Sequence, residues 1–174
     1  MKKLQLYVDL ARPFTLLPPA LGVVSGAVTA WGAHGSRDAV TLATFLPVLW
    51  GALMAAVLNS ASNAINQIYD LEIDRVNKPK RPLPSGALSL REAWAFTLAG
   101  YALAWVLAWL AVPPGLEARR ECFWIVVFTS LLVWAYSAPP FRTKAHGIWA
   151  NVTIAIPRGI LLKVAGWSTV KTVL

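Results

Sequence analysis

The stretch NAINQIYDLEIDRVNKPKRPLPSG, residues 63–86, gathers three acidic and four basic side chains into one short segment. The rest of the chain is different, because 57% of its 174 residues are hydrophobic and only 14% are charged. A soluble domain carries about 25% charged residues. The composition therefore favours a membrane protein in which this charged stretch lies outside the hydrocarbon layer.

Long uncharged segments on both sides of this stretch support the same reading. No Asp, Glu, Lys or Arg occurs at 13–36, 39–69, 93–116 or 122–141. Each segment can supply the roughly 20 apolar residues that a transmembrane helix needs. A fifth apolar region, 148–167, is interrupted by Arg158 and Lys163. We predict an all-α fold, a polytopic membrane helix bundle with about five transmembrane helices, built as a single integral membrane domain over residues 1–174.

The positions of the Lys and Arg side chains predict the orientation of the bundle. If the N-terminus is cytoplasmic, ten of them fall in cytoplasmic segments, and three, at Arg37, Arg119 and Arg120, fall on the other side. Positive charge accumulates on the cytoplasmic side, so we expect the N-terminus and the charged stretch there, most simply in a plasma (inner) membrane. The net charge of +8 then reflects topology and contact with membrane lipids. No nucleic-acid-binding module is recognised, so we expect no nucleic-acid partner.

A polar stripe runs along the second apolar segment and into the charged stretch. Its members follow one another at helical steps of three or four residues: Asn59, Asn63, Asn66, Asp70 and Asp74. On one continuous helix they span an arc of about 80°. Amides are costly against lipid, so this face should look into the bundle or into a wet cavity.

The two carboxylates of the stripe predict a bound cation. Asp70 and Asp74 form a like-charge pair one helical turn apart, which repels unless a cation lies between them. Carboxylate and amide oxygens without nearby sulfur or imidazole favour Mg²⁺, which binds proteins through one or two carboxylates together with substrate phosphates. Arg75 and Arg81 follow and can bind the diphosphate that such a metal would hold. The alternative is a basic cytoplasmic loop with asparagines that join helices.

Two further features follow from the residues alone. Ser89 and Glu92 are spaced as a capping box for the helix that starts near residue 93. Arg158 lies ten residues after Ile148, about 15 Å into the bilayer, where a guanidinium needs an anion or a carbonyl partner. We expect Arg158 to face the cavity and to bind the acceptor or a phosphate.

These motifs resemble the first aspartate-rich motif of UbiA-type intramembrane prenyltransferases. That motif reads N-x-x-x-D-x-x-x-D and is followed by a K/R-P-x-P/A-S-G turn, which corresponds to NQIYDLEIDRVNKPKRPLPSG here. ARPFTLLPPALG, at 11–22, and YSAPPFRTK, at 136–144, support the resemblance, and the second is similar to a loop of chlorophyll synthases, homogentisate prenyltransferases and digeranylgeranylglyceryl phosphate synthase-like members. The resemblance runs along the whole chain.

The resemblance implies an all-helical bundle of roughly nine spans around a central cavity. It implies that Asn66, Asp70 and Asp74 hold Mg²⁺ on a prenyl diphosphate and that Arg81 binds the diphosphate, with Asn63 lining the same face. The isoprenoid chain would pass from the ionised diphosphate to a lipophilic or aromatic acceptor. Among Tyr136, Arg142 and Lys144, the spacing leaves open which cation accompanies the tyrosine of the family pattern.

The chain departs from the family after its fourth apolar segment. The family carries a second aspartate-rich motif, whereas no acidic residue follows Glu121 here. We therefore expect an N-terminal portion of such an enzyme, with a missing C-terminal half as its partner. Two other functions stay open at this point: a small cation-coupled membrane transporter, and an inactive remnant that binds prenyl diphosphate.

Overall fold

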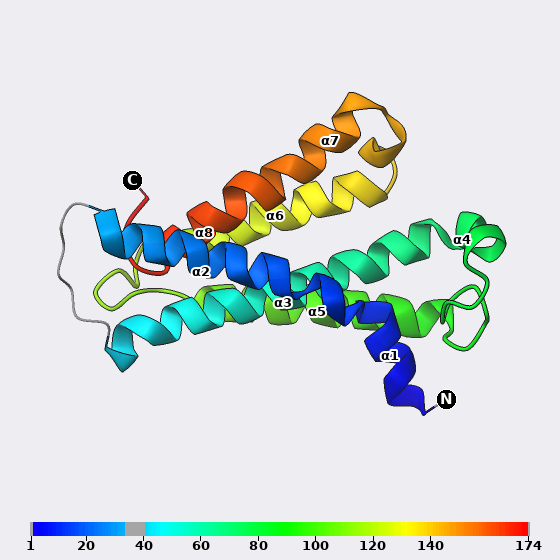
Figure 1. Ribbon diagram of the computed structural model, residues 1–174, viewed down its shortest axis with the longest axis horizontal. Helices are drawn as coiled ribbons and strands as arrows, with labels where there is room; N and C mark the ends of the chain where they lie inside the picture. Colours follow the sequence, from blue (N-terminus) through cyan, green and yellow to red (C-terminus); the bar gives the residue numbers. More distant parts are fainter. Residues whose placement is uncertain (1, 34–40, 174) are drawn as a thin grey trace.

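The computed structural model describes residues 2–33 and 41–173, which form helices and connecting loops without a strand in either range (Figure 1). The elements are, in chain order, α1 (Lys3–Ala11), η1 (Pro13–Thr15), α2 (Leu17–Gly32), α3 (Leu42–Tyr69), α4 (Leu71–Asn77), α5 (Leu90–Leu110), α6 (Glu121–Ser137), η3 (Thr143–Ala145), α7 (Ile148–Ala155), η4 (Ile156–Leu161) and α8 (Leu162–Ser168). The all-α prediction is confirmed.

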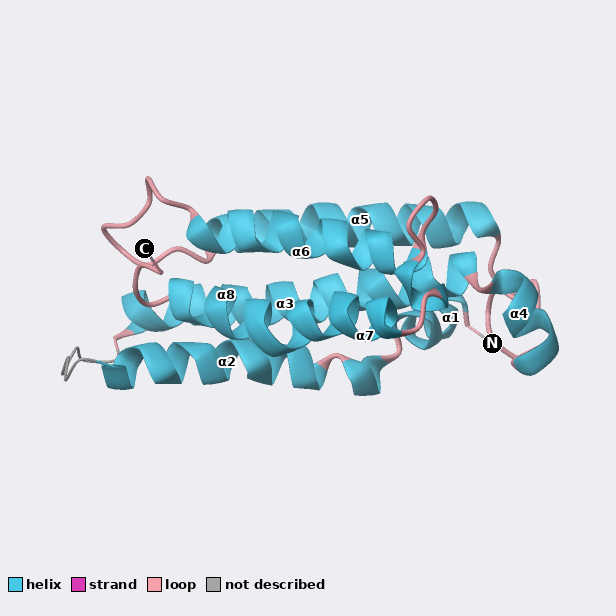
Figure 2. Ribbon diagram, turned by 90° about the horizontal axis from the view of Figure 1, so that it is seen from above, coloured by secondary structure: helices cyan, strands magenta, loops and turns pink. Residues whose placement is uncertain are grey.

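The long helices lie side by side along one axis, with the loops gathered at the two ends (Figure 2). The N-terminus, α4 and the loops at 78–89 and 138–147 lie at one end, and the C-terminus lies at the other (Figure 1). The first of these is called the Asp70 end below. The N-terminus and the charged stretch therefore share one end of the bundle, as the sequence predicted.

Helix α3 is the centre of the bundle and packs most extensively against α5 and α2. A capping box starts it, in which the Thr41 side chain accepts from Thr44 N and the Thr44 side chain accepts from Thr41 N. Small residues allow the close approach of α5, since a Cβ on Gly100 would lie 3.0 Å from the Cβ of Ala61. Ser89 and Glu92 form the expected capping box at the start of α5.

Two glycines bring α2 and α8 into backbone contact. A Cβ on Gly26 would overlap the carbonyl oxygen of Lys163, and a Cβ on Gly166 would overlap the carbonyl oxygen of Val23. Small residues permit such close helix crossings in membranes, where association depends on van der Waals packing. This crossing fixes the position of η4, the π-helical turn that directly precedes α8.

The first helical region is broken at Arg12. Arg12 has left-handed backbone angles (φ 58°, ψ 68°) and precedes Pro13, which cannot donate to the preceding turn. The whole segment Lys3–Thr15, which contains this break, meets α2 (Leu17–Gly32) at 47°. Side chains of α3 bind the carbonyls that the break leaves free: Gln67 Nε2 donates to Leu10 O at 2.9 Å, and Asn63 Nδ2 donates to Ala11 O at 2.9 Å. A break inside a membrane is tolerated when neighbouring helices satisfy the freed backbone groups in this way.

Among residues 2–33 and 41–173, three or four of the five predicted spans have the length and apolar composition of a membrane-crossing helix. Three helical segments are long and apolar enough to cross a bilayer, namely Leu42–Tyr69, Leu90–Leu110 and Ile148–Ser168, and the bent region before Ala33 makes a fourth if it counts as one span. Helix α6 has 17 residues, about 26 Å, because it ends before Pro139 and Pro140. The expected first span and Arg37 extend into residues 34–40, which lie outside the described ranges.

Candidate active site

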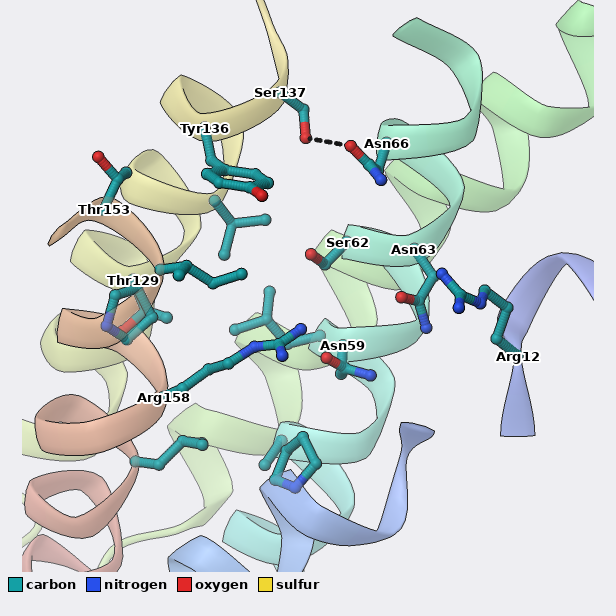
Figure 3. A pocket seen from close by; sticks show the side chains of 17 residues that line it. Arg12, Asn59, Ser62, Asn63, Asn66, Thr129, Tyr136, Ser137, Thr153 and Arg158 are labelled. Carbon is teal, nitrogen blue, oxygen red and sulfur yellow. Dashed lines mark hydrogen bonds between the residues drawn. The ribbon is translucent and has the colours of Figure 1, made fainter. Parts of the chain in front are cut away.

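A pocket of about 200 Å³ lies between α2, α3, α6 and the α7–η4 segment (Figure 3). Its apolar wall consists of proline and aliphatic side chains from these elements. Its polar lining comprises Arg12, Asn59, Ser62, Asn63, Asn66, Thr129, Tyr136, Ser137, Thr153 and Arg158. The asparagine stripe on α3 therefore faces a cavity inside the bundle, as its helical phase predicted.

At the Asp70 end of this pocket, one oxygen from α3 and one from Asp70, the residue that follows α3, converge on one cation. Lys144 Nζ donates to Asn66 Oδ1 at 2.7 Å and to Asp70 Oδ1 at 2.6 Å. Ser137, at the end of α6, donates to the same Asn66 oxygen at 3.3 Å and so closes the pocket between the two helices (Figure 3). The Lys144 side chain is 12% exposed. Asn66, Asp70, Ser137, Arg142 and Lys144 are called the Asp70 cluster.

Arg142 adds a second positive charge to the Asp70 cluster. Its Nη2 lies 3.6 Å from Asp70 Oδ1 and 3.4 Å from the carbonyl oxygen of Tyr69. Its Nε is buried and has no hydrogen-bond partner, and the hydroxyl of the adjacent Thr143 is also buried and unpaired. A buried donor without a partner is costly. These groups are therefore suited to an anionic ligand such as a phosphate oxygen.

Asp74 has different cation partners from Asp70, and its metal-binding function stays a prediction. Helix α3 ends at Tyr69, Asp70 has φ −99° and ψ 9°, and a separate helix, α4, begins at Leu71. Asp74 is buried and binds Arg81 at 2.6 Å and Lys78 at 3.6 Å. The stripe was predicted on one continuous helix, whereas the helix is interrupted at Asp70, between Asn66 and Asp74. No Lys or Arg among residues 2–33 and 41–173 pairs with both carboxylates.

Arg75 forms no ion pair with Asp70 or Asp74. Its Nη1 lies 2.8 Å from Glu72 Oε1, and the two side chains are 56% and 80% exposed. They form a solvated pair one turn apart on α4, a type of pair that contributes little to stability. Arg81, by contrast, is held against the buried Asp74, so the two arginines that the sequence grouped together occupy different surroundings.

Asn59 and Asn63 have a structural function in addition to lining the pocket. Asn59 Nδ2 donates to Thr15 O at 2.9 Å, and Asn63 Nδ2 donates to Thr15 Oγ1 at 2.8 Å. Both amides therefore bind the segment that follows the break at Arg12. The alternative in which asparagines join helices accounts for Asn59 and Asn63. Asn66 and Asp70 instead bind a cationic side chain, which fits the prediction of a cation site.

Tyr136 and Arg158 also line the pocket, and their functions stay predictions. Tyr136 on α6 lines the pocket next to Ser137. Arg158 on η4 also lines it and points toward α3 (Figure 3), which confirms that this arginine faces the cavity. Between Arg142 and Lys144, it is Lys144 that makes the shorter contacts with Asn66 and Asp70.

Sequence reasoning missed Arg12, Ser137 and Gln67. Arg12 lines the pocket at the break in the first helical region. The Arg-Pro pair at the start of an apolar segment is the sequence feature that could have indicated this position. Gln67 is 2% exposed and falls outside the stripe of Asn and Asp residues, although it follows Asn63 by one turn. Ser137 carried no signal of its own.

Asn66 and Asp70 can supply two of the oxygen ligands that a magnesium ion needs. Asn66 and Asp70 already place two hard oxygens around one positive group, and Mg²⁺ completes its coordination with water and substrate phosphate. Within the described ranges no group of three or more His, Cys, Asp or Glu residues could hold a metal on its own. A metal here would depend on an anionic ligand for its remaining coordination.

Comparison with known proteins places this geometry in a wider context. The model of the UbiA prenyltransferase family matches residues 16–174. A digeranylgeranylglyceryl phosphate synthase of Methanopyrus kandleri is 36% identical over 149 residues, covering 86% of this chain and 48% of that protein.

Solved structures agree with the sequence comparison. A structure described as a digeranylgeranylglyceryl phosphate synthase in membranes matches with a TM-score of 0.80 at 27% identity, covering 99% of this chain and 55% of that one. A UbiA homolog from Archaeoglobus fulgidus bound to GPP and Mg²⁺ matches with a TM-score of 0.72 at 29% identity, covering 95% and 54%. The chain spans about half the length of the relatives that it matches.

Proposed function

Because this chain belongs to the UbiA prenyltransferase family, we propose that it binds a prenyl diphosphate with Mg²⁺ and takes part in moving the isoprenoid group to a lipophilic acceptor within the membrane. The observation that carries the proposal is the convergence of Asn66 and Asp70 oxygens on Lys144 Nζ, at 2.7 and 2.6 Å. Relatives and neighbours named for this chemistry support it.

The charges of the site suit a metal diphosphate. Asp70 is paired with Arg142 and Lys144, and Asp74 is paired with Lys78 and Arg81, so each carboxylate has two cations near it. The surplus of positive charge attracts a diphosphate, and the carboxylates can accept a divalent cation in exchange for their ammonium or guanidinium partners. Mg²⁺, when bound, neutralises charge on the leaving diphosphate.

The chain's own residues position the diphosphate and stabilise the charge that develops on it. Asn66, on α3, and Asp70, the residue at which α3 ends, would hold the metal, and Lys144 would turn from them to a phosphate oxygen. Arg142 donates its unpaired Nε to the same group. When the bond between the allylic carbon and the diphosphate oxygen breaks, the electron pair stays on that oxygen, where these donors stabilise it. Tyr136 faces the pocket into which the isoprenoid group extends.

A second helical half, corresponding to the part of the relatives that this chain does not span, would complete the cavity. Only 17% of the membrane window in Ile148–Ser168 is buried, against 39% for the window in Leu42–Tyr69. The segment that contains Arg158 therefore offers an uncovered face beside the pocket. We infer that the Asp70 end lies on the cytoplasmic side of a plasma (inner) membrane, because most Lys and Arg residues fall in segments at that end.

The test is metal-dependent binding of geranyl diphosphate to the protein in lipid nanodiscs, measured by calorimetry with Mg²⁺ or with EDTA. Wild type should bind at least tenfold more tightly with Mg²⁺, and Asp70→Asn should abolish that difference. Glu72→Gln is the matched control, because Glu72 lies two residues away and is 80% exposed. Equal binding with and without the metal in wild type would refute the proposal.

Transfer is tested separately from binding. With an acceptor supplied and the second half co-expressed, the proposal expects prenylated product that disappears in Asp70→Asn. Metal-dependent binding without product in that complete assembly would instead identify an inactive prenyl-diphosphate-binding protein. No contact within the described ranges favours the transporter alternative, because the amide groups of Asn59 and Asn63 bind the first helical region and Asn66 binds Lys144.

A further inference from the structure

Ser137, the last residue of α6, connects that helix to Asn66 on α3. Ser137 is 1% exposed, and its hydroxyl donates to Asn66 Oδ1 at 3.3 Å (Figure 3). Within residues 2–33 and 41–173, Asn66 is the hydrogen-bond partner of this hydroxyl. A buried hydroxyl that loses its partner is costly, because no water replaces the lost bond. Burial of Ser137 therefore favours the side-chain position in which Asn66 keeps this contact.

The end of α6 is held in place by aromatic packing against α5. Trp134, three residues before Ser137, contacts the rings of Trp94 and Tyr101 at centroid distances of 5.8 and 6.4 Å. Tilted ring pairs of this kind add to the energy of burial. The helix then ends with Ala138 N donating to Trp134 O at 2.8 Å, and Ala138 is fully buried. The hydroxyl of Ser137 is therefore presented to α3 from a fixed position.

Asn66 is held in a different way from the other asparagines of the stripe. The Nδ2 groups of Asn59 and Asn63 donate to the first helical region. In the described ranges, the Asn66 side chain bonds through its oxygen, which accepts from Ser137 and from Lys144. An amide oxygen has two acceptor positions, and these two donors fill both. A metal that replaces Lys144 takes one acceptor position, and Ser137 keeps the other.

We infer that Ser137 is a positioning residue, whose hydroxyl holds the Asn66 side chain toward the metal when Lys144 moves to the diphosphate. The inference rests on the proposed function, because it names a residue that supports a metal ligand of that site. Without Ser137, the departure of Lys144 leaves Asn66 free to rotate, and metal binding must order it again. Residues that hydrogen-bond to metal ligands orient them, and their loss weakens metal binding by about 10- to 100-fold.

The experiment measures binding of geranyl diphosphate to the protein in nanodiscs by calorimetry, with Mg²⁺ or with EDTA. Ser137→Ala should weaken binding about tenfold with Mg²⁺ and leave binding with EDTA unchanged. A general loss of packing would instead weaken both. Ser130→Ala is the matched control, because Ser130 lies on the same helix, is 4% exposed, and has a hydroxyl that donates to Val126 O and accepts from Trp105 Nε1. That variant loses buried hydrogen bonds away from Asn66 and should retain the wild-type response to Mg²⁺.

A second measurement tests the contact without metal or substrate. Reversible unfolding in detergent and SDS is compared for Ser137→Ala, Asn66→Ala and the double variant. Because the two side chains bond to each other, the destabilisation of the double variant should be smaller than the sum of the single effects. Ser130→Ala combined with Asn66→Ala should be additive, since these two residues share no contact.

Three results would overturn the positioning function of Ser137. These are a wild-type response to Mg²⁺ in Ser137→Ala, an equal loss of binding with Mg²⁺ and with EDTA, and additive effects of Ser137→Ala and Asn66→Ala on unfolding. Each of them can occur while wild type binds geranyl diphosphate more tightly with Mg²⁺, so the proposed function would stand. Absence of any Mg²⁺ response in wild type would refute the proposed function itself, and this inference with it.

Discussion

Gly26→Ala is expected to destabilise the bundle by forcing α2 away from α8. The added Cβ would lie 2.9 Å from the carbonyl carbon of Lys163 and closer still to its oxygen. An ordinary contact with that carbon begins at 3.4 Å, so the helices must separate by at least 0.5 Å. The atom in the way is backbone and cannot rotate aside. Overpacking of this kind costs about 1–3 kcal/mol.

Gly32→Ala is the matched control, because it lies in the same helix and a Cβ there would have nothing within 4 Å. The assay is reversible unfolding in mixed micelles of detergent and increasing SDS, followed by circular dichroism. Gly32→Ala should match wild type or exceed it slightly, since Ala favours helix more than Gly does. A Gly26→Ala protein as stable as the Gly32→Ala protein would refute the close crossing.

A double variant tests the geometry further. Gly166→Ala would overlap Val23 O on the opposite side of the same crossing. One separation of the helices relieves both overlaps, so the destabilisation of the double variant should be smaller than the sum of the single effects. Simple additivity would show that the two glycines act at independent contacts.

Three further predictions follow from single contacts. Asn63→Ala removes two hydrogen bonds to the first helical region and should lower the free energy of unfolding by about 1–4 kcal/mol; unchanged stability in the same SDS assay would contradict it. Lys144→Met removes the ammonium that holds Asp70, so calorimetry should show tighter Mg²⁺ binding without diphosphate and weaker binding of diphosphate, whereas weaker Mg²⁺ binding would count against the exchange of partners. Ser89→Ala removes the cap that pairs with Glu92 and should cost about 1 kcal/mol, measured against Ser85→Ala in the neighbouring turn.

The polar stripe shows how far sequence reasoning reached in this protein. Helical phase was sufficient to place Asn66 and Asp70 on one face and to direct that face into a cavity, because α3 is regular up to Tyr69. The same phase did not indicate that the helix is interrupted at Asp70, before Asp74. Arg158 was placed correctly by depth alone, because charge at that level of a membrane helix has few alternatives.

The contacts that sequence could not provide are between segments distant in the chain. Gln67 and Asn63 bind backbone carbonyls that become free only because the first helical region breaks at Arg12. An Arg-Pro pair can mark such a break, but the residues that bind the free carbonyls lie more than fifty positions away. The division of cations, with Lys144 at Asp70 and Arg81 at Asp74, likewise depends on how the loops fold over the Asp70 end.

The most direct test of the central claim is a structure of the protein in nanodiscs with Mg²⁺ and geranyl diphosphate bound. We expect Mg²⁺ at about 2 Å from an oxygen of Asp70, with Asn66 facing it and with Lys144 moved from Asp70 to a phosphate oxygen. A diphosphate bound elsewhere, with Lys144 still paired to Asp70, would contradict it.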